Sequence, residues 1–187
     1  MQSNNDTKNI VYIPGTGEPV SNRPEYPGID IFQGKSDDAM LQNADWIITQ
    51  SIGCNYVFSR IPIGQQKFII TNPGYIKKKS FLTLAWRSIL FLLFSRADDG
   101  LHTIVPLSYW ISTLKTVYRL TKIDTLAMLK KIPKGNLTVI CGMQDKFYCN
   151  RKEVEVLKRE NIPYIMVDAG HLWNHNTLAV VQNIINS

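Results

Sequence analysis

The chain has 187 residues, 44% of them apolar and 19% charged, which suits one domain or one core with a small appendage. It is long enough to bury a core without a metal or a disulfide. Its three cysteines form an odd set without metal-ligand spacing, as expected in a reducing compartment. The polar start and the lack of an apolar run near the roughly 20 residues that span a bilayer predict a cytoplasmic protein without a signal peptide or membrane-spanning helix.

The net charge of +6 belongs to one segment. Between Ile76 and Lys122 the chain carries eight bases and only two acids, Asp98 and Asp99, so the remainder is neutral. Lys77, Lys78 and Lys79 make this segment compatible with a weak contact to an anionic membrane surface, although a solvated helix start is the favoured explanation. No recognised nucleic-acid module with interleaved aromatics is present, so a DNA or RNA partner has only electrostatic support and is not expected.

Strand and helix signals alternate along most of the chain. Short apolar runs bounded by glycine or proline predict strands, and apolar residues at helical spacing predict helices. The expected strands are 9–13, a weak one at 29–32, 45–49, 67–71, 137–141 and 164–167, and the expected helices are 37–43, 52–61, 151–161 and 178–185. Strands separated by helices pair in parallel, so we expect an α/β fold with a mostly parallel sheet of about six strands and helices on both faces.

Residues 75–134 interrupt this alternation, because the whole segment passes without a clear strand. The run 81–94 is apolar around almost its whole circumference, 103–120 is more mixed, and 123–131 predicts a short amphipathic turn or helix. We interpret 75–134 as a helical cap, or lid, inserted across one end of a core made of residues 1–74 and 135–187.

Ser51 is the first candidate for chemistry, because it lies between the strand 45–49 and an immediate helix. Such a sharp turn lifts a serine hydroxyl off the sheet and points the N-terminus of the helix at it. Gly53 lets the helix approach its neighbours closely. The turn fits the pattern G-x-S-x-G except that Thr49 replaces the first glycine. The alternative is that Ser51 is only the N-cap of the helix.

Asp145 and His171 follow the last two predicted strands. Ligands of a parallel sheet bind beyond the carboxyl ends of the strands, where both residues would lie with Ser51. Taken singly, Asp145 also fits a loop residue or a helix cap, and His171 fits a surface loop. Taken together, serine, aspartate and histidine follow three separate strands in the chain order of one known catalytic triad.

A glycine-rich turn, Pro14-Gly15-Thr16-Gly17, follows the first predicted strand. With the N–H group of Ile52, a backbone N–H group of Thr16 would form an oxyanion hole beside Ser51. A phosphate-binding loop is the rival interpretation, but neither G-x-G-x-x-G nor a Gly-Lys-Ser/Thr sequence is present.

Four stretches together resemble the α/β-hydrolase superfamily. IVYIPGTGEP resembles its first core strand and oxyanion turn, ITQSIG its nucleophile elbow, VICGMQD its acid loop and DAGHLW the loop that carries its base. They occur in the family's order and roughly its spacing, with the 75–134 insert where the family has its cap. The resemblance implies a small serine hydrolase with a helical cap.

The expected reaction is nucleophilic acyl transfer by Ser51, His171 and Asp145, without a cofactor or a metal. The apolar insert favours a small-molecule ester or thioester with an apolar acyl group, with Trp86, Trp110 and His102 as candidate substrate contacts. The same apolar residues fit simple packing of the cap on the core. A non-catalytic or weakly active binding or regulatory protein on the same fold remains the alternative function.

Overall fold

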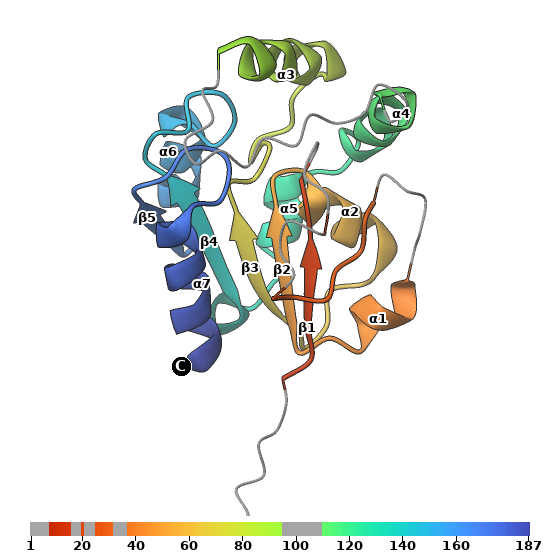
Figure 1. The fold of residues 1–187 in the computed structure, drawn as a ribbon, viewed down its shortest axis with the longest axis vertical. Helices are drawn as coiled ribbons and strands as arrows, with labels where there is room; N and C mark the ends of the chain where they lie inside the picture. The colour runs from red at the N-terminus through yellow and green to blue at the C-terminus, as the bar shows by residue number, and fades with distance from the viewer. Residues whose placement is uncertain (1–7, 16–19, 21–24, 32–36, 95–109) are drawn as a thin grey trace, which may run out of the picture.

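The computed structural model describes residues 8–15, 20, 25–31, 37–94 and 110–187. A five-stranded parallel sheet forms its centre, and the spatial order of the strands follows their order in the chain (Figure 1). The strands are β1 (Ile10–Ile13), β2 (Trp46–Gln50), β3 (Lys67–Thr71), β4 (Leu137–Gly142) and β5 (Tyr164–Val167). The carboxyl ends of all five strands therefore meet at one edge of the sheet.

Seven helices are described. They are α1 (Asp38–Gln42), α2 (Gly53–Arg60), α3 (Phe81–Phe94), α4 (Trp110–Leu120), α5 (Thr125–Leu129), α6 (Arg151–Arg159) and α7 (His175–Asn186). Local signals set several of their ends: the side chains of Asp37, Asn150 and Asn174 cap α1, α6 and α7 by accepting backbone N–H groups of the first turn. No helix of the described part of the chain is long and apolar enough to cross a membrane.

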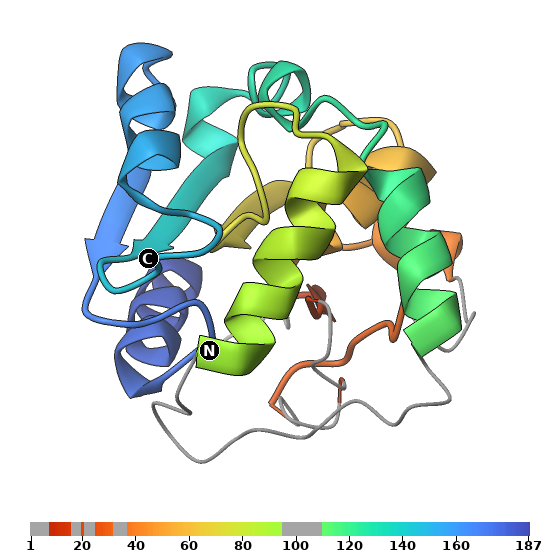
Figure 2. The ribbon, with the colours of Figure 1, turned by 90° about the horizontal axis from the view of Figure 1, so that it is seen from above.

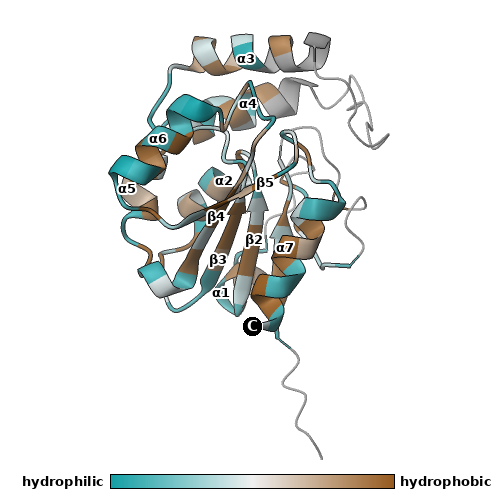
Figure 3. Cartoon of the chain, turned by 90° about the vertical axis from the view of Figure 1, so that its left-hand side faces the viewer, coloured by the Kyte–Doolittle hydropathy of each residue, from teal (hydrophilic) through white to brown (hydrophobic). Residues whose placement is uncertain are grey.

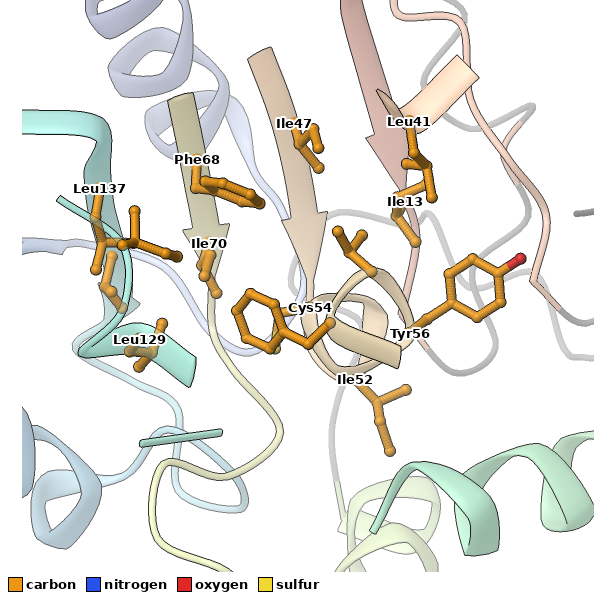
Figure 4. Packing of buried hydrophobic residues seen from close by; sticks show 14 of the residues in the cluster. Ile13, Leu41, Ile47, Ile52, Cys54, Tyr56, Phe68, Ile70, Leu129 and Leu137 are labelled. Atoms are coloured by element: carbon orange, nitrogen blue, oxygen red, sulfur yellow. The ribbon is translucent and has the colours of Figure 1, made fainter. Parts of the chain in front are cut away.

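Two apolar clusters bury the two faces of the sheet. One contains Ile47, Phe68 and Ile70 with the inward residues of α1, α2 and α6, and Figure 4 shows its centre. The other packs the opposite side chains of the strands against Trp173 and α7. In Figure 3 the strands are mostly hydrophobic, whereas α6 and α7 alternate hydrophilic and hydrophobic residues, as expected for strands buried on both faces beneath amphipathic helices. The α/β fold with helices on both faces is confirmed.

The sheet has five strands rather than about six, because the weak strand predicted at 29–32 does not form within its described residues. One parallel bridge joins Tyr12 to Gly28: Tyr12 N donates to Pro27 O at 2.9 Å, and Ile29 N donates to Tyr12 O at 3.0 Å. Ile29 and Ile31 are then buried in the core cluster without continuing the ladder. Their apolar pattern therefore reflects burial rather than strand pairing.

Helices α3 and α4 lie above the carboxyl edge of the sheet (Figures 1 and 2). The rings of Phe81 and Tyr118 join the two helices, with centroids 5.6 Å apart. Helix α5 instead packs beside the sheet, where Leu129 is fully buried. The structure thus places α3 and α4 where a cap would lie, and the division into core and cap stays a prediction.

Candidate active site

Ser51, Asp145 and His171 lie in three loops at the carboxyl edge of the sheet, after β2, β4 and β5. The structure brings their side chains into one chain of hydrogen bonds. His171 Nδ1 is 2.7 Å from Asp145 Oδ2, and His171 Nε2 is 3.0 Å from Ser51 Oγ. All three residues are more than 90% buried. A neutral imidazole that donates its Nδ1–H group to the carboxylate can accept the serine proton on the lone pair of Nε2.

Ser51 occupies a strained turn. Its φ of 51° is in the left-handed region that non-glycine residues rarely adopt, and its N–H group donates to Thr71 O at 2.9 Å. A Cβ atom on Gly53 would lie 2.7 Å from Ile13 O, and one on Gly15 would lie 2.7 Å from Ser51 Cβ. Only glycine fits at these two positions, so the backbone packs tightly around the serine.

Thr49 occupies the position of the missing first glycine without a strained backbone. It lies in β2, in register with Ile13 and Ile70, and its φ is not positive. The residue is fully buried, and its Oγ1 atom has no hydrogen-bond partner among the described residues. The cost of the threonine is thus a buried hydroxyl rather than a distorted turn.

Asp145 is held by its own loop. Its Oδ1 atom accepts the N–H groups of Phe147 and Tyr148 at 3.0 and 2.9 Å, and Oδ2 accepts that of Cys149 at 2.9 Å. Burial raises the pKa of the Asp145 carboxyl, but His171 and the backbone donors lower it by more, so its pKa lies below the ordinary value. Asp145 is not the N-cap of α6, since Asn150 is.

His171 is a buried loop residue rather than a surface one. Its ring packs against that of Tyr148, with centroids 4.2 Å apart and planes tilted by 33°. Its carbonyl oxygen accepts Asn72 Nδ2 at 2.9 Å and Gln50 Nε2 at 3.3 Å. The ring and the backbone of this residue are therefore both fixed.

The start of α2 and Gly74 lie next to Ser51. Ile52 is the N-cap residue of α2, and its N–H group has no acceptor within the described ranges. A Cβ atom on Gly74 would lie 3.5 Å from Ser51 Oγ and 3.6 Å from Ile52 N. Of the two predicted oxyanion donors, Ile52 is thus placed beside the serine, while Thr16 lies outside the described residues.

The three predicted substrate contacts are only partly placed. Trp86 lies on α3 and is 60% exposed, whereas Leu84 of the same helix is buried. Packing on the core therefore accounts for Leu84 but not for Trp86. Trp110 begins α4 with its side chain undescribed, and His102 lies outside the described residues.

Cysteine chemistry does not compete with the serine at this site. Burial raises the pKa of Cys54 to about 12. A hydrogen bond with Cys141, at 3.1 Å between the sulfur atoms, and burial both raise the pKa of the Cys149 thiol. Cys54 and Cys149 therefore stay protonated core groups, which are poor nucleophiles.

Sequence reasoning did not single out Gln50, Asn72, Gly74 or Tyr148. Asn72 and Gly74 follow β3. Site residues were predicted from the sequence after each of the other four strands but none after β3. The sequence signal that could have identified Asn72 and Gly74 is a polar residue and a glycine just after an apolar strand, because that strand ends at the same edge as the Ser51, Asp145 and His171 loops.

No protein-family profile and no curated protein matches the chain. Solved structures do match over nearly its whole length. A lipase-esterase related protein from Clostridium acetobutylicum is 14% identical with a TM-score of 0.58, covering 96% of this chain and 95% of that one. The thioesterase domain from the curacin biosynthetic pathway is 13% identical with a TM-score of 0.55, covering 95% and 90%. A type II thioesterase from the yersiniabactin pathway is 12% identical with a TM-score of 0.52, covering 98% and 93%. The chain therefore has an α/β-hydrolase fold.

Proposed function

We propose that the protein is a serine hydrolase that cleaves a carboxylic ester or thioester with an apolar acyl group. The observation that carries the proposal is the buried relay Asp145–His171–Ser51, with links of 2.7 and 3.0 Å. Structures with this fold include proteins described as thioesterases and as esterase-related, which agrees with the proposed class of reaction.

Ser51 attacks the acyl carbon while its proton moves to His171 Nε2. The new bond is Ser51 Oγ to carbon, and the carbonyl electron pair moves onto oxygen. Asp145, which is ionised at neutral pH, holds the imidazole and stabilises its charged form. The oxyanion then reforms the carbonyl and breaks the bond from the acyl carbon to the leaving oxygen or sulfur, which takes the proton from His171 Nε2. Water repeats the sequence on the acyl-serine and releases the acid and the free Ser51 hydroxyl.

Stabilisation of the oxyanion is assigned to backbone N–H groups of Ile52 and Thr16. Ile52 supports this role because it is the N-cap residue of α2, at the end of the helix where N–H groups are unpaired and the helix dipole favours negative charge. One such donor is typically worth about 3 kcal/mol of transition-state stabilisation. The apolar helix α3, which lies above the carboxyl edge of the sheet, supports an apolar acyl group, and Trp86, Trp110 and His102 remain proposed contacts.

Labelling by a fluorophosphonate probe and turnover of p-nitrophenyl esters of increasing chain length test the proposal. We expect the wild type to be labelled and active, Ser51→Ala to be neither, and Ser59→Ala to behave as the wild type. Ser59 lies on α2, and its hydroxyl donates to the carbonyl oxygen of Tyr56 at 2.7 Å. A folded wild type that is neither labelled nor active would favour the non-catalytic binding protein instead.

We also propose that the outer face of α3 makes a weak contact with an anionic membrane surface. Leu82 and Trp86 are 78% and 60% exposed one helical turn apart, and the exposed Lys77 and Lys78 precede the helix. Apolar side chains beside lysines match the chemistry of an anionic lipid interface.

Sedimentation with phosphatidylcholine vesicles, with and without phosphatidylglycerol, tests this contact. Binding should require phosphatidylglycerol and should fall in the double variant Lys77→Glu/Lys78→Glu. The control Lys131→Glu/Lys134→Glu makes the same charge change just before β4, at the other edge of the sheet. Equal loss in both variants would contradict a contact through α3.

A further inference from the structure

Asn72 connects the loops of two proposed catalytic residues. It follows β3, is fully buried, and has a φ of 42°. Its Oδ1 atom accepts the N–H group of Gly142 at 2.6 Å, and its Nδ2 atom donates to Gly170 O and His171 O, both at 2.9 Å. One side-chain amide thus satisfies three backbone groups from two loops.

Those two loops carry the acid and the base. Gly142 ends β4 and accepts the N–H group of Asp145 at 3.1 Å, so it begins the turn that presents the carboxylate. The loops also touch directly, because a Cβ atom on Gly142 would lie 2.2 Å from Gly170 O and 2.5 Å from Ala169 O. Two backbone hydrogen bonds, Met143 N to Val167 O at 2.8 Å and Gln144 N to Ala169 O at 3.0 Å, join the same loops. Contact between backbones leaves no flexible side chain to absorb a shift, so the bonds of Asn72 add to the restraints that fix the distance between the loops.

Gln50 also hydrogen-bonds the loop that carries His171, but not the loop that carries Asp145. Its Nε2 atom donates to His171 O, and its Oε1 atom accepts the hydroxyl of Tyr12 at 3.0 Å. None of these bonds reaches the acid loop. Asn72 differs because it touches both loops at once.

We propose that Asn72 is a positioning residue of the active site. Its amide holds the Asp145 and His171 loops at the separation at which the imidazole reaches Asp145 Oδ2 and Ser51 Oγ together. Asn72 itself touches no reacting atom. The inference rests on the proposed hydrolase function, since only catalysis by this relay gives the separation a chemical consequence.

The residue type matches both demands of the position. Asparagine tolerates a positive φ better than most residues, and its amide offers one acceptor and two donors in the required directions. An aspartate would keep the acceptor for Gly142 but turn a carboxylate oxygen toward two carbonyls. A glycine would suit the backbone but remove the Asn72 partner of Gly142 N and Gly170 O, and it would leave His171 O with Gln50 as its side-chain donor.

The test compares Asn72→Asp and Asn72→Gly with Asn55→Asp. Asn55 is an equally buried asparagine whose Nδ2 atom donates to Tyr75 and Thr125 rather than to the catalytic loops. For each variant, kcat and KM on a p-nitrophenyl ester are measured with the folded fraction. We expect kcat to fall on the order of 100-fold in both Asn72 variants with little change in KM, because small misplacements of catalytic groups have such effects. Asn55→Asp should lose stability without this loss of kcat.

A spectroscopic readout keeps the two proposals separate. In histidine labelled with ¹⁵N, the His171 Nδ1–H proton bound to Asp145 should resonate at low field in the wild type and in Asn55→Asp, and should weaken or vanish in both Asn72 variants. An unchanged signal and kcat in folded Asn72 variants would overturn the positioning role. A wild type with the signal but without labelling or turnover would overturn the hydrolase function alone.

Discussion

The carboxylate of Asp145 lies 2.7 Å from His171 Nδ1 and is itself fixed by three backbone N–H groups of its own loop. Replacing Asp145 by asparagine keeps the shape but puts an amide donor or a neutral acceptor against the imidazole. We expect Asp145→Asn to lower kcat on the order of 10⁴-fold, as loss of the carboxylate does in other triads. Asp168→Asn is the control, because Asp168 is exposed and bonds Gln144 instead. Equal kcat values in the two variants would contradict the relay.

The lowered pKa of Asp145 predicts a pH dependence of folding. Because the carboxyl is more acidic in the folded than in the unfolded protein, it adds to the free energy of unfolding above its ordinary pKa of about 4, and this contribution is lost as the pH falls below that value. Between pH 7 and pH 3 the wild type should therefore lose more free energy of unfolding than Asp145→Asn. Urea unfolding at both pH values measures this difference, and parallel losses in the two proteins would contradict it.

Gly74 lies beside Ser51 Oγ and Ile52 N. A methyl group there would lie 3.5 Å or more from its neighbours, so Gly74→Ala should fold with an unchanged melting temperature. The methyl would nevertheless occupy the place of the substrate carbonyl, and we expect kcat/KM to fall on the order of tenfold or more. Gly135→Ala is the control, since nothing lies within 4 Å of its added carbon. Full activity in Gly74→Ala would place the substrate elsewhere.

Local patterns predicted the elements of the fold well. The strands at 67–71 and 164–167 and the helix at 81–94 have the expected bounds, and each other predicted helix with placed ends agrees within a few residues. The strand at 29–32 failed because two isoleucines that pack into the core have the same alternation as a paired strand. The spacing of apolar residues indicates which side chains are buried. Whether a segment pairs as a strand depends on segments far away in the sequence.

The candidate triad was accessible from the sequence because each member directly follows a strand, and parallel strands end at one edge. Asn72 was not accessible in the same way. Its importance comes from two loops 70 and 98 residues further on, and a lone asparagine after a strand is indistinguishable from an ordinary turn residue. Tyr148 was hidden for the same reason, since its contact with His171 depends on how two loops fold together.

Replacing Thr49 by valine should make the protein more stable. Its buried hydroxyl has no partner in the described ranges, and an unpaired buried hydroxyl costs about 1 kcal/mol or more. Thr49→Val keeps the shape and removes the hydroxyl, so we expect the free energy of unfolding to rise by about 1 kcal/mol without loss of kcat. Thr49→Gly should lower it, because it restores the usual motif but empties a packed site in β2. A stability loss in Thr49→Val would show that the hydroxyl has a partner.

Glu153 of α6 anchors the chain between β3 and α3. This buried residue of α6 accepts the N–H groups of Ile76 and Lys77 at 2.9 and 3.2 Å, and its Oε1 atom lies 2.9 Å from Lys79 Nζ. Glu153→Ala leaves two N–H groups and a partly buried ammonium without their partner, so the free energy of unfolding should fall by about 3 kcal/mol. Glu153→Gln keeps an acceptor for the N–H groups, so its free energy of unfolding should fall by less.

Glu155→Ala is the matched control, because Glu155 lies on the same helix and is exposed. Limited proteolysis separates anchoring from general stability: cleavage within 76–80 should accelerate in Glu153→Ala under conditions where the sheet stays intact. Since α3 follows this segment directly, the same variant should also change KM for long-chain esters more than for the acetate. A uniform loss across chain lengths would mean that the position of α3 does not affect the acyl group.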